Sequence, residues 1–199
     1  MRYTIALTTL VASVFAMESC AAPAPAPTPS PAPGPGYFGV MSARSASPVH
    51  LRPLVARGGK FYLGGETASY CPVAQVGSAC PPGNTTVLAG GETTLSLGVV
   101  VPGGQQVYVA PDGALSYTQA HSAYIPTGSV VDGFSREYPA AGQAFGYLQF
   151  DTGFVACPAE GDGVYQVFGQ VDGATFGPEC LGFNALAVSV DGPGAWQYS

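Results

Sequence analysis

The sequence predicts an all-β fold, either an antiparallel β-sandwich or a closed barrel of about 10–12 short strands. Short runs rich in Val, Thr, Tyr and Phe recur between turn residues, and no segment sustains the i, i+3, i+4 apolar pattern of a helix. Five Asp-Gly pairs punctuate these runs, and Asp-Gly suits the positive φ angles of tight hairpins. A β-trefoil is the alternative fold, although no clear repeat recurs at a third of the domain.

Strands are expected where β-branched and aromatic residues cluster between Gly, Pro and Asp. In chain order the expected strands span residues 49–56, 60–63, 85–89, 93–101, 105–110, 114–119, 144–151, 164–170, 185–190 and 195–198. An Asp-Gly pair separates the fifth strand from the sixth, two more pairs flank the eighth, and another follows the ninth. The fifth and sixth strands are therefore expected to form a hairpin.

The N-terminal part of the chain predicts export. Residues 1–21 have the features of a secretory signal peptide, with Arg2 before a short apolar core and small residues at Ser19-Cys20-Ala21. Cleavage is expected after Ala21, with cleavage after Ala16 as the alternative. Residues 22–36 are a Pro/Ala-rich linker that favours an extended polyproline II conformation. Residues 37–199 then form a single all-β domain of a protein released outside the cell.

Cysteines and one sequon fit this extracellular setting. Removal of the signal leaves Cys71, Cys80, Cys157 and Cys180, which predict two disulfides in a secreted chain. The local connectivity, Cys71–Cys80 and Cys157–Cys180, is favoured among three possible pairings. Metal binding is disfavoured because neither pair has CxxC spacing and histidines are few. Asn84, in Asn-Thr-Thr, is a predicted N-glycosylation site.

Charge narrows the class of partner. The net charge is −6, which argues against nucleic acid and anionic membranes and favours basic proteins or neutral glycans. No membrane insertion is expected, because the apolar run of the signal is too short to span a bilayer. Partner and cofactor predictions are therefore limited to a basic protein or a glycan, with no cofactor.

The sequence predicts a protein without enzymatic activity. Only two histidines, His50 and His121, are available as general bases, and no G-x-S-x-G nucleophile motif occurs. Five of the twelve carboxylates fall in Asp-Gly turns, where they stabilise the turn and remain solvated, and nothing in the sequence pairs the others, so a facing pair for glycoside hydrolysis is not evident. No catalytic residue and no metal ligand are assigned.

The stretch from Val101 to Pro126 is the candidate recognition surface. Strand alternation directs Val107 and Val109 inward and Gln106 and Tyr108 outward, ahead of a Pro-Asp-Gly turn. Tyrosines offer large contact area at a low entropic cost and suit protein or sugar contacts. The predicted contact residues are Gln106, Tyr108, Asp112, Tyr117, His121 and Tyr124.

Six segments, in this order, resemble the small secreted fungal proteins known as IgE-binding proteins. They are "VMSARSASPVHLRPL", "GGKFYLGG", "PGGQQVYVAPDGALSYTQAHSAYIP", "FVACP", "YQVFGQ" and "CLGF". The resemblance extends from about Phe38 to the closing "AWQYS", and the segment at Val101 to Pro126 is its most specific part. The Pro/Ala-rich linker has no counterpart in it.

The resemblance implies a secreted fungal antigen or allergen of the culture fluid or cell wall. Relatives from plant pathogens act as elicitors that the host plant or its immune receptors recognise without any enzymatic activity. The resemblance also suggests binding to a basic, thaumatin-like host defence protein, which the acidic charge of this chain would suit. A fungal cell-wall carbohydrate-binding protein is the alternative function.

Overall fold

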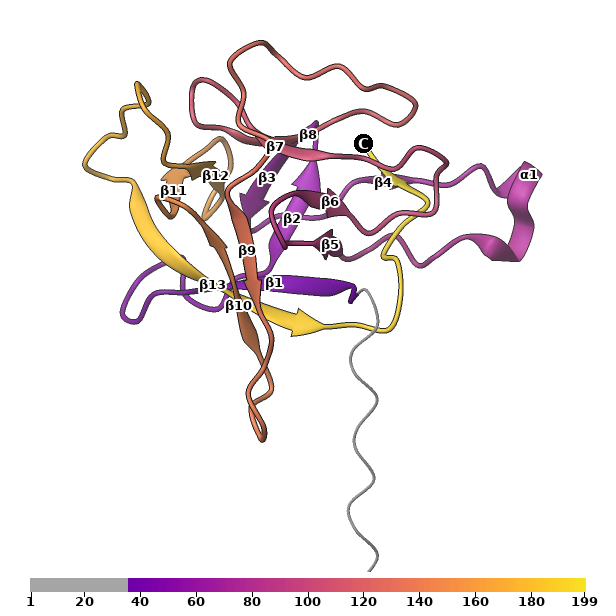
Figure 1. The fold of residues 1–199 in the computed structure, drawn as a ribbon, viewed down its shortest axis with the longest axis horizontal. Coiled ribbons are helices and arrows are strands. Elements are labelled where there is room, and N and C mark those ends of the chain that lie inside the picture. Colours follow the sequence, from indigo (N-terminus) through magenta and orange to yellow (C-terminus); the bar gives the residue numbers. More distant parts are fainter. Residues whose placement is uncertain (1–35) are drawn as a thin grey trace, which may run out of the picture. The chain divides into compact units, whose positions relative to one another are not determined.

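The computed structural model describes residues 36–199, which form mostly antiparallel strands with little helix (Figure 1). The strands are β1 (Phe38–Ala43), β2 (Leu54–Arg57), β3 (Lys60–Leu63), β4 (Ser69–Tyr70), β5 (Leu88–Gly90), β6 (Leu95–Leu97), β7 (Val107–Val109), β8 (Leu115–Tyr117), β9 (Phe134–Glu137), β10 (Gly146–Phe150), β11 (Phe154–Pro158), β12 (Tyr165–Gly169), β13 (Leu181–Ser189) and β14 (Gln197–Tyr198). The one α-helical turn, α1 (Val73–Val76), continues into the 3-10 turn Gly77–Ala79. The predicted signal peptide (1–21) and linker (22–36, apart from Gly36) lie outside the described residues.

Two sheets share the long strand β13. Its C-terminal part pairs with β1, from Phe38 opposite Ser189 to Ala43 opposite Asn184, and with β10 on its other side. Its N-terminal part pairs with β11, where Phe154 lies opposite Phe183. One sheet therefore has the order β6-β5-β1-β13-β10-β9, and the other runs from β13 through β11, β12 and β3 to β8 and β7. β2 pairs with β3 and extends the second sheet.

This arrangement confirms the predicted all-β, sandwich-like fold, whereas the closed-barrel alternative is wrong. The two end strands, β6 and β7, meet through a single isolated bridge between Ser96 and Gln106. The backbone N–H of Leu97 donates to the carbonyl of Gln105 beside it, at 2.9 Å. A barrel requires a continuous ladder between its first and last strands, and one bridge does not provide it. The β-trefoil alternative does not fit either, since β13 links both sheets and no threefold arrangement of strands results.

The core lies between the sheets and contains a row of aromatic rings. Alternate residues of β1 are buried, as expected for a strand with one face toward the core. Phe134 packs against Phe150, with ring centroids 5.0 Å apart, and Phe150 continues the contact to Phe154 at 6.1 Å. Phe38 and Phe61 are completely buried from the side of β1 and β3. Burial of these side chains supplies much of the driving force that holds the two sheets together.

Several expected strands are present with shorter limits, and several real strands were not expected. The expected strand 60–63 coincides with β3, and 144–151 contains β10. The structure adds β1, β4, β9 and β11, and β13 begins four residues before the expected strand 185–190. β11 is buried at three consecutive residues, so it lacks the alternation by which half-buried strands are found in a sequence. β9 does alternate between buried and exposed residues, but one buried position is Arg136, so its sequence does not show an apolar alternation.

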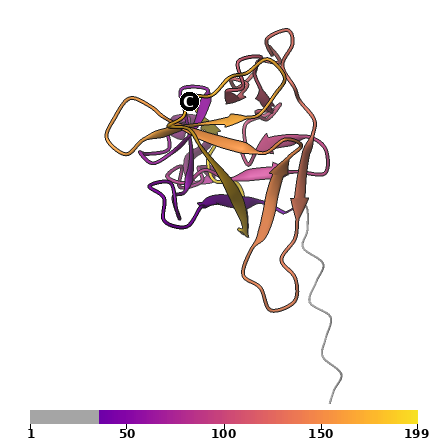
Figure 2. The same ribbon diagram turned by 90° about the vertical axis from the view of Figure 1, so that its left-hand side faces the viewer.

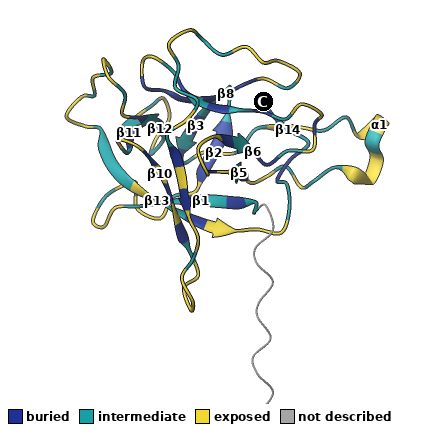
Figure 3. Ribbon diagram, in the orientation of Figure 1, coloured by how far each residue is buried: buried dark blue, intermediate teal, exposed yellow. Residues whose placement is uncertain are grey.

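Both predicted disulfides are formed. Cys71 and Cys80 are joined with their Cα atoms 6.0 Å apart, and Cys157 and Cys180 with theirs 4.1 Å apart. The second bridge connects the end of β11 to the segment just before β13. The first closes the loop that carries α1, in which α1 and the following 3-10 turn contain no buried residue. Figure 3 shows this loop as exposed and intermediate in burial, so the bridge takes the place of a packed core there.

The hairpin between β9 and β10 projects from the sheets, which is plain in both views (Figures 1 and 2). At its base Arg136 lies over the rings of Phe38 and Tyr138, with its guanidinium carbon 4.1 Å and 4.5 Å from their centroids. This guanidinium also donates to the carbonyl of Gly36 and to the hydroxyl of Ser189. Burial lowers the pKa of Arg136. The cation–π contacts thus join β9 to the start of β1.

Candidate recognition surface

The predicted hairpin of the Val101–Pro126 stretch is present as β7 and β8. Val107 faces Tyr117 and Val109 faces Leu115 in an antiparallel register. Val107 and Val109 are completely buried, and Tyr108 between them is only half-buried. The prediction from strand alternation is therefore confirmed for these three residues. In β7 one face belongs to the core and the other is partly open to contact.

The turn of the hairpin depends on Asp112 and Gly113. The backbone N–H of Ala110 donates to the carbonyl of Ala114 at 2.9 Å, and Gly113 has a φ of 87°. A side chain at Gly113 would also lie 3.1 Å from the carbonyl oxygen of Gly169. The Asp112 carboxylate accepts the N–H of Ala114 at 3.0 Å and stays exposed. The Asp-Gly pair thus forms the turn and leaves a negative charge at its tip.

Gln105 begins the hairpin on its inner face with a fully enclosed amide. Its Nε2 donates to the carbonyls of Thr118 and Tyr198, each at 3.0 Å, and its Oε1 accepts the N–H of Tyr198 at 2.8 Å. The amide therefore pairs with β14 as a neighbouring strand would. The side chain is 1% exposed, and these three bonds offset the cost of burying it.

Tyr117 was predicted to lie on the contact surface, and this prediction is wrong. Its side chain is 3% exposed and meets Phe61 edge to face, with centroids 5.3 Å apart. Its hydroxyl donates to the carbonyl of Ser199 at 3.2 Å. β8 is buried at all three of its residues, so alternation does not place any of them on the surface. Burial raises the pKa of Tyr117 to about 12.

Tyr108 is the centre of the outward face. Burial raises the pKa of its phenol, a hydrogen bond with the side chain of Ser116 opposes this, and the charges of Tyr124 and Asp112 raise it further. Asp112 lies in the turn after β7, and Tyr124, which is 75% exposed, lies in the loop after β8. Two phenols and a carboxylate of the predicted surface thus belong to the hairpin and to the loop that follows it.

That loop is fixed at both ends. It leaves β8 through Thr118, whose N–H donates to the carbonyl of Gln106 at 2.9 Å. It returns to β7 at Val130, which exchanges two backbone hydrogen bonds of 2.8 Å with Val109. Between these points His121 is exposed and has a φ of 63°, in the left-handed region that is uncommon for residues other than Gly but in which His, Asn and Asp are enriched.

We define the outer hairpin surface as Gln106, Tyr108, Asp112, His121 and Tyr124, which are half-buried or exposed on the hairpin and its following loop. It contains five of the six predicted contact residues. The predicted role of these residues in recognition stays a prediction. The other histidine, His50, lies between β1 and β2, where its Nδ1 accepts the N–H of Arg44 at 3.2 Å.

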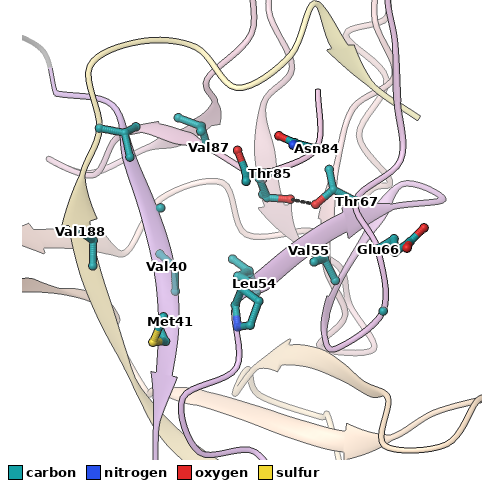
Figure 4. Close-up of a pocket in the computed structure, with 15 residues that line it drawn as sticks. Val40, Met41, Leu54, Val55, Glu66, Thr67, Asn84, Thr85, Val87 and Val188 are labelled. Carbon is teal, nitrogen blue, oxygen red and sulfur yellow. Dashed lines mark hydrogen bonds between the residues drawn. The ribbon is translucent and has the colours of Figure 1, made fainter. Parts of the chain in front are cut away.

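Sequence reasoning did not find a groove beside β1 and β2, which we call the β1–β2 groove. It has a volume of about 600 Å³ and is lined by residues of β1, β2 and β13 and of two loops (Figure 4). Val40, Leu54 and Val87 line it and are buried, and Asn84, the predicted glycosylation site, lies in the same lining. The sequence holds no local signal for this groove because its walls come from distant segments.

Two further features bear on the kind of site. Among residues 36–199, no group of three or more His, Cys, Asp or Glu side chains is placed to hold a metal ion. Within the same range, no helix has the length and apolar character needed to cross a membrane.

The structure is that of a disulfide-bonded, all-β protein with an exposed aromatic hairpin surface. Residues 38–199 match the model of the PhiA-like secreted proteins, and the chain belongs to this family. A protein of Arthroderma benhamiae, described as an uncharacterized secreted protein, is 43% identical over 155 residues, which cover 74% of this chain and 77% of the relative. No solved structure matches the chain. The protein is therefore a secreted, PhiA-like protein, similar to one of fungal origin.

Proposed function

We propose that this protein is a non-enzymatic extracellular recognition protein that binds a basic protein through the outer hairpin surface. One set of observations supports this most directly: Tyr108 on the outward face of β7, Asp112 in the exposed turn and Tyr124 in the loop after β8 belong to one continuous stretch of chain. Tyrosines recur among the residues that dominate binding energy in protein interfaces. The hairpin holds them in place before binding, which lowers the entropic cost of association.

The negative charge of this chain favours a positively charged partner. The chain has a net charge of −6, and Asp112 adds a carboxylate at the tip of the hairpin, within the outer hairpin surface. Such a surface attracts a basic partner over long range and accelerates association at low ionic strength. A basic, thaumatin-like host defence protein has this chemistry. Recognition by the host would then make the same protein an antigen or an elicitor of plant defence.

Binding of the purified protein to a basic thaumatin-like protein, measured by biolayer interferometry, tests the proposal. Tyr124→Ala is expected to weaken binding by about tenfold or more, as for a central contact residue. Asp112→Asn keeps the oxygen that accepts the N–H of Ala114 and removes the charge, so it should slow association mainly at low salt. Tyr70→Ala, at a tyrosine that is 54% exposed on β4, is the matched control. Equal loss of binding in all three variants, or no binding at all, would contradict the proposal.

The elicitor role has its own test. A synthetic peptide of residues 101–126 and the intact protein are infiltrated into leaves, and the defence response is compared. The two ends of the loop after β8 are held by hydrogen bonds to Gln106 and to Val109 of β7, so we expect the intact protein to be active and the peptide to be weak. A full response to the peptide would show that the epitope is linear and does not need the hairpin.

A glycan is the second candidate ligand, because exposed tyrosine rings beside a glutamine amide and a carboxylate also suit sugar binding. A pull-down with chitin and β-glucan distinguishes the two candidates. Saturable binding that free sugar competes, and that Tyr108→Ala abolishes, would replace the protein partner with a cell-wall glycan.

A further inference from the structure

The β1–β2 groove has an apolar floor made of buried side chains and an exposed apolar margin. Val40, Leu54, Val55 and Val87 are each at most 6% exposed, and Val188 at the margin is 40% exposed. The volume of about 600 Å³ lies within the range of sites that enclose ligands. The exposed apolar side chains of the lining are Val188 and Val190, 40% and 38% exposed, at its margin.

One side of the groove is polar and carries Asn84. Figure 4 shows Asn84, Thr67 and Glu66 on one side, opposite Val188, Val40 and Met41. Asn84 is exposed, so its amide is free to carry a substituent. The predicted attachment point of a glycan is therefore part of the lining of the groove.

The third residue of the sequon belongs to the core. Thr86 is 6% exposed, and its hydroxyl accepts the N–H of Ala56 at 2.7 Å and hydrogen-bonds with the hydroxyl of Thr67 at 2.9 Å. The hydroxyl required for recognition of the acceptor is thus enclosed once the domain has folded. Modification of Asn84 has to precede folding, and the sheets then close beside a sugar that is already attached.

We propose that an N-linked glycan on Asn84 occupies the β1–β2 groove and is a built-in cover for its apolar floor. The first sugar is tethered by the Asn84 amide at the edge of the groove, so the entropic cost of bringing it there has been met by the covalent bond. Its ring C–H groups and its acetyl methyl group pack against Val87 and the neighbouring valines. Its hydroxyl groups face Thr67 and Glu66. This role is independent of the outer hairpin surface.

The chain offers a control in which the same glycan is moved elsewhere. Glu92 is exposed in the turn between β5 and β6 and is followed by two threonines, so Glu92→Asn alone creates an acceptor. Neither Glu92 nor its neighbours line the groove. Combined with Asn84→Gln, this substitution keeps the general solubility effect of a glycan and removes the local cover.

The full chain is secreted from a glycosylating yeast in three forms: unchanged, Asn84→Gln, and Asn84→Gln with Glu92→Asn. Intact mass measures glycan occupancy, and the fluorescence of an apolar dye measures access to the groove. The unchanged protein should carry a glycan and bind little dye, and both variants should show a several-fold increase. Enzymatic release of the glycan from the folded protein should also be slower at Asn84 than at the moved site.

Three results would overturn the proposal. The first is an unoccupied Asn84 in the secreted protein. The second is equally low dye binding in the unchanged protein and in the form with the moved glycan. The third is a free apolar molecule retained in the groove, detected by native mass spectrometry while the glycan is in place. Near-ultraviolet circular dichroism of all forms verifies that the core is intact, since Asn84 and Glu92 are both exposed.

Discussion

The inner and outer faces of the β7–β8 hairpin contain the same residue types, but the inner residues pack in the core and the outer residues are accessible to solvent. Gln105 and Tyr117 point into the protein and are 1% and 3% exposed, whereas Gln106 and Tyr108 are half-buried and Tyr124 is 75% exposed. The inner amide and phenol hydrogen-bond to the C-terminal segment at Tyr198 and Ser199. The outer amide and phenols, of Gln106, Tyr108 and Tyr124, are accessible to solvent. Residue type alone therefore does not separate a core residue from a contact residue in this stretch.

The largest expected difference between the two faces is in how their tyrosines affect the stability of the fold at high pH. Burial raises the pKa of Tyr117 and of Tyr198 to about 12, from the usual value of 10.0. Because the folded-state pKa values lie above the unfolded ones, their contribution is present in full below pH 10 and is lost as the pH rises toward 12. The loss for the two groups together is on the order of 5 kcal/mol.

Denaturation at a series of alkaline pH values, with phenolate absorbance recorded in parallel, measures this effect. Two tyrosines should ionise late and together with unfolding, and Tyr117→Phe should remove one of them. Ionisation of all tyrosines in a single early step, without loss of structure, would contradict the assignment of Tyr117 to the inner face.

The next largest effect is expected from replacing one tyrosine on each face by alanine. Tyr117→Ala removes the contact with Phe61 and leaves a cavity, so it should lower the free energy of unfolding by about 3–5 kcal/mol. Tyr124→Ala changes an exposed side chain and should alter it by less than about 0.5 kcal/mol. Urea denaturation of the two variants provides the comparison, and similar values for both would invalidate the division into faces.

Replacing Gln105 and Gln106 in turn should give a smaller difference in the free energy of unfolding, again with the larger loss on the inner face. Gln105→Ala leaves the N–H and the carbonyl of Tyr198 without their partner, at a cost of about 2 kcal/mol. Gln106→Ala, the adjacent control, should cost less than about 0.5 kcal/mol because its side chain has no such bond. Thermal unfolding followed by circular dichroism is sufficient to measure both. A greater cost for Gln106→Ala would show that the facing of the strand is reversed.

The hairpin also shows how much of the burial of its residues could be predicted from the sequence. Alternation placed Val107, Val109 and Tyr108 correctly, because β7 has one buried face and one open face. Tyr117 was assigned to the contact surface as a tyrosine, without regard to its facing, and it lies opposite Val107 on the inner face of the hairpin. β11 escaped prediction because three of its residues in a row are buried, so its sequence does not alternate. Patterns of alternation report only strands that have an exposed face.

Local chemistry determined the all-β class, the Asp-Gly turn of the hairpin, and secretion, for which nearby residues are sufficient. Both disulfides were also predicted correctly, since each joins cysteines that are close in the chain, separated by 9 and 23 residues. Tertiary structure alone decided that β13 joins two sheets, that Gln105 binds β14, and that the β1–β2 groove places Asn84 beside Val40 and Val188. Those features bring together residues tens to more than a hundred positions apart, and the spacing of residues along the chain carries no information about such contacts.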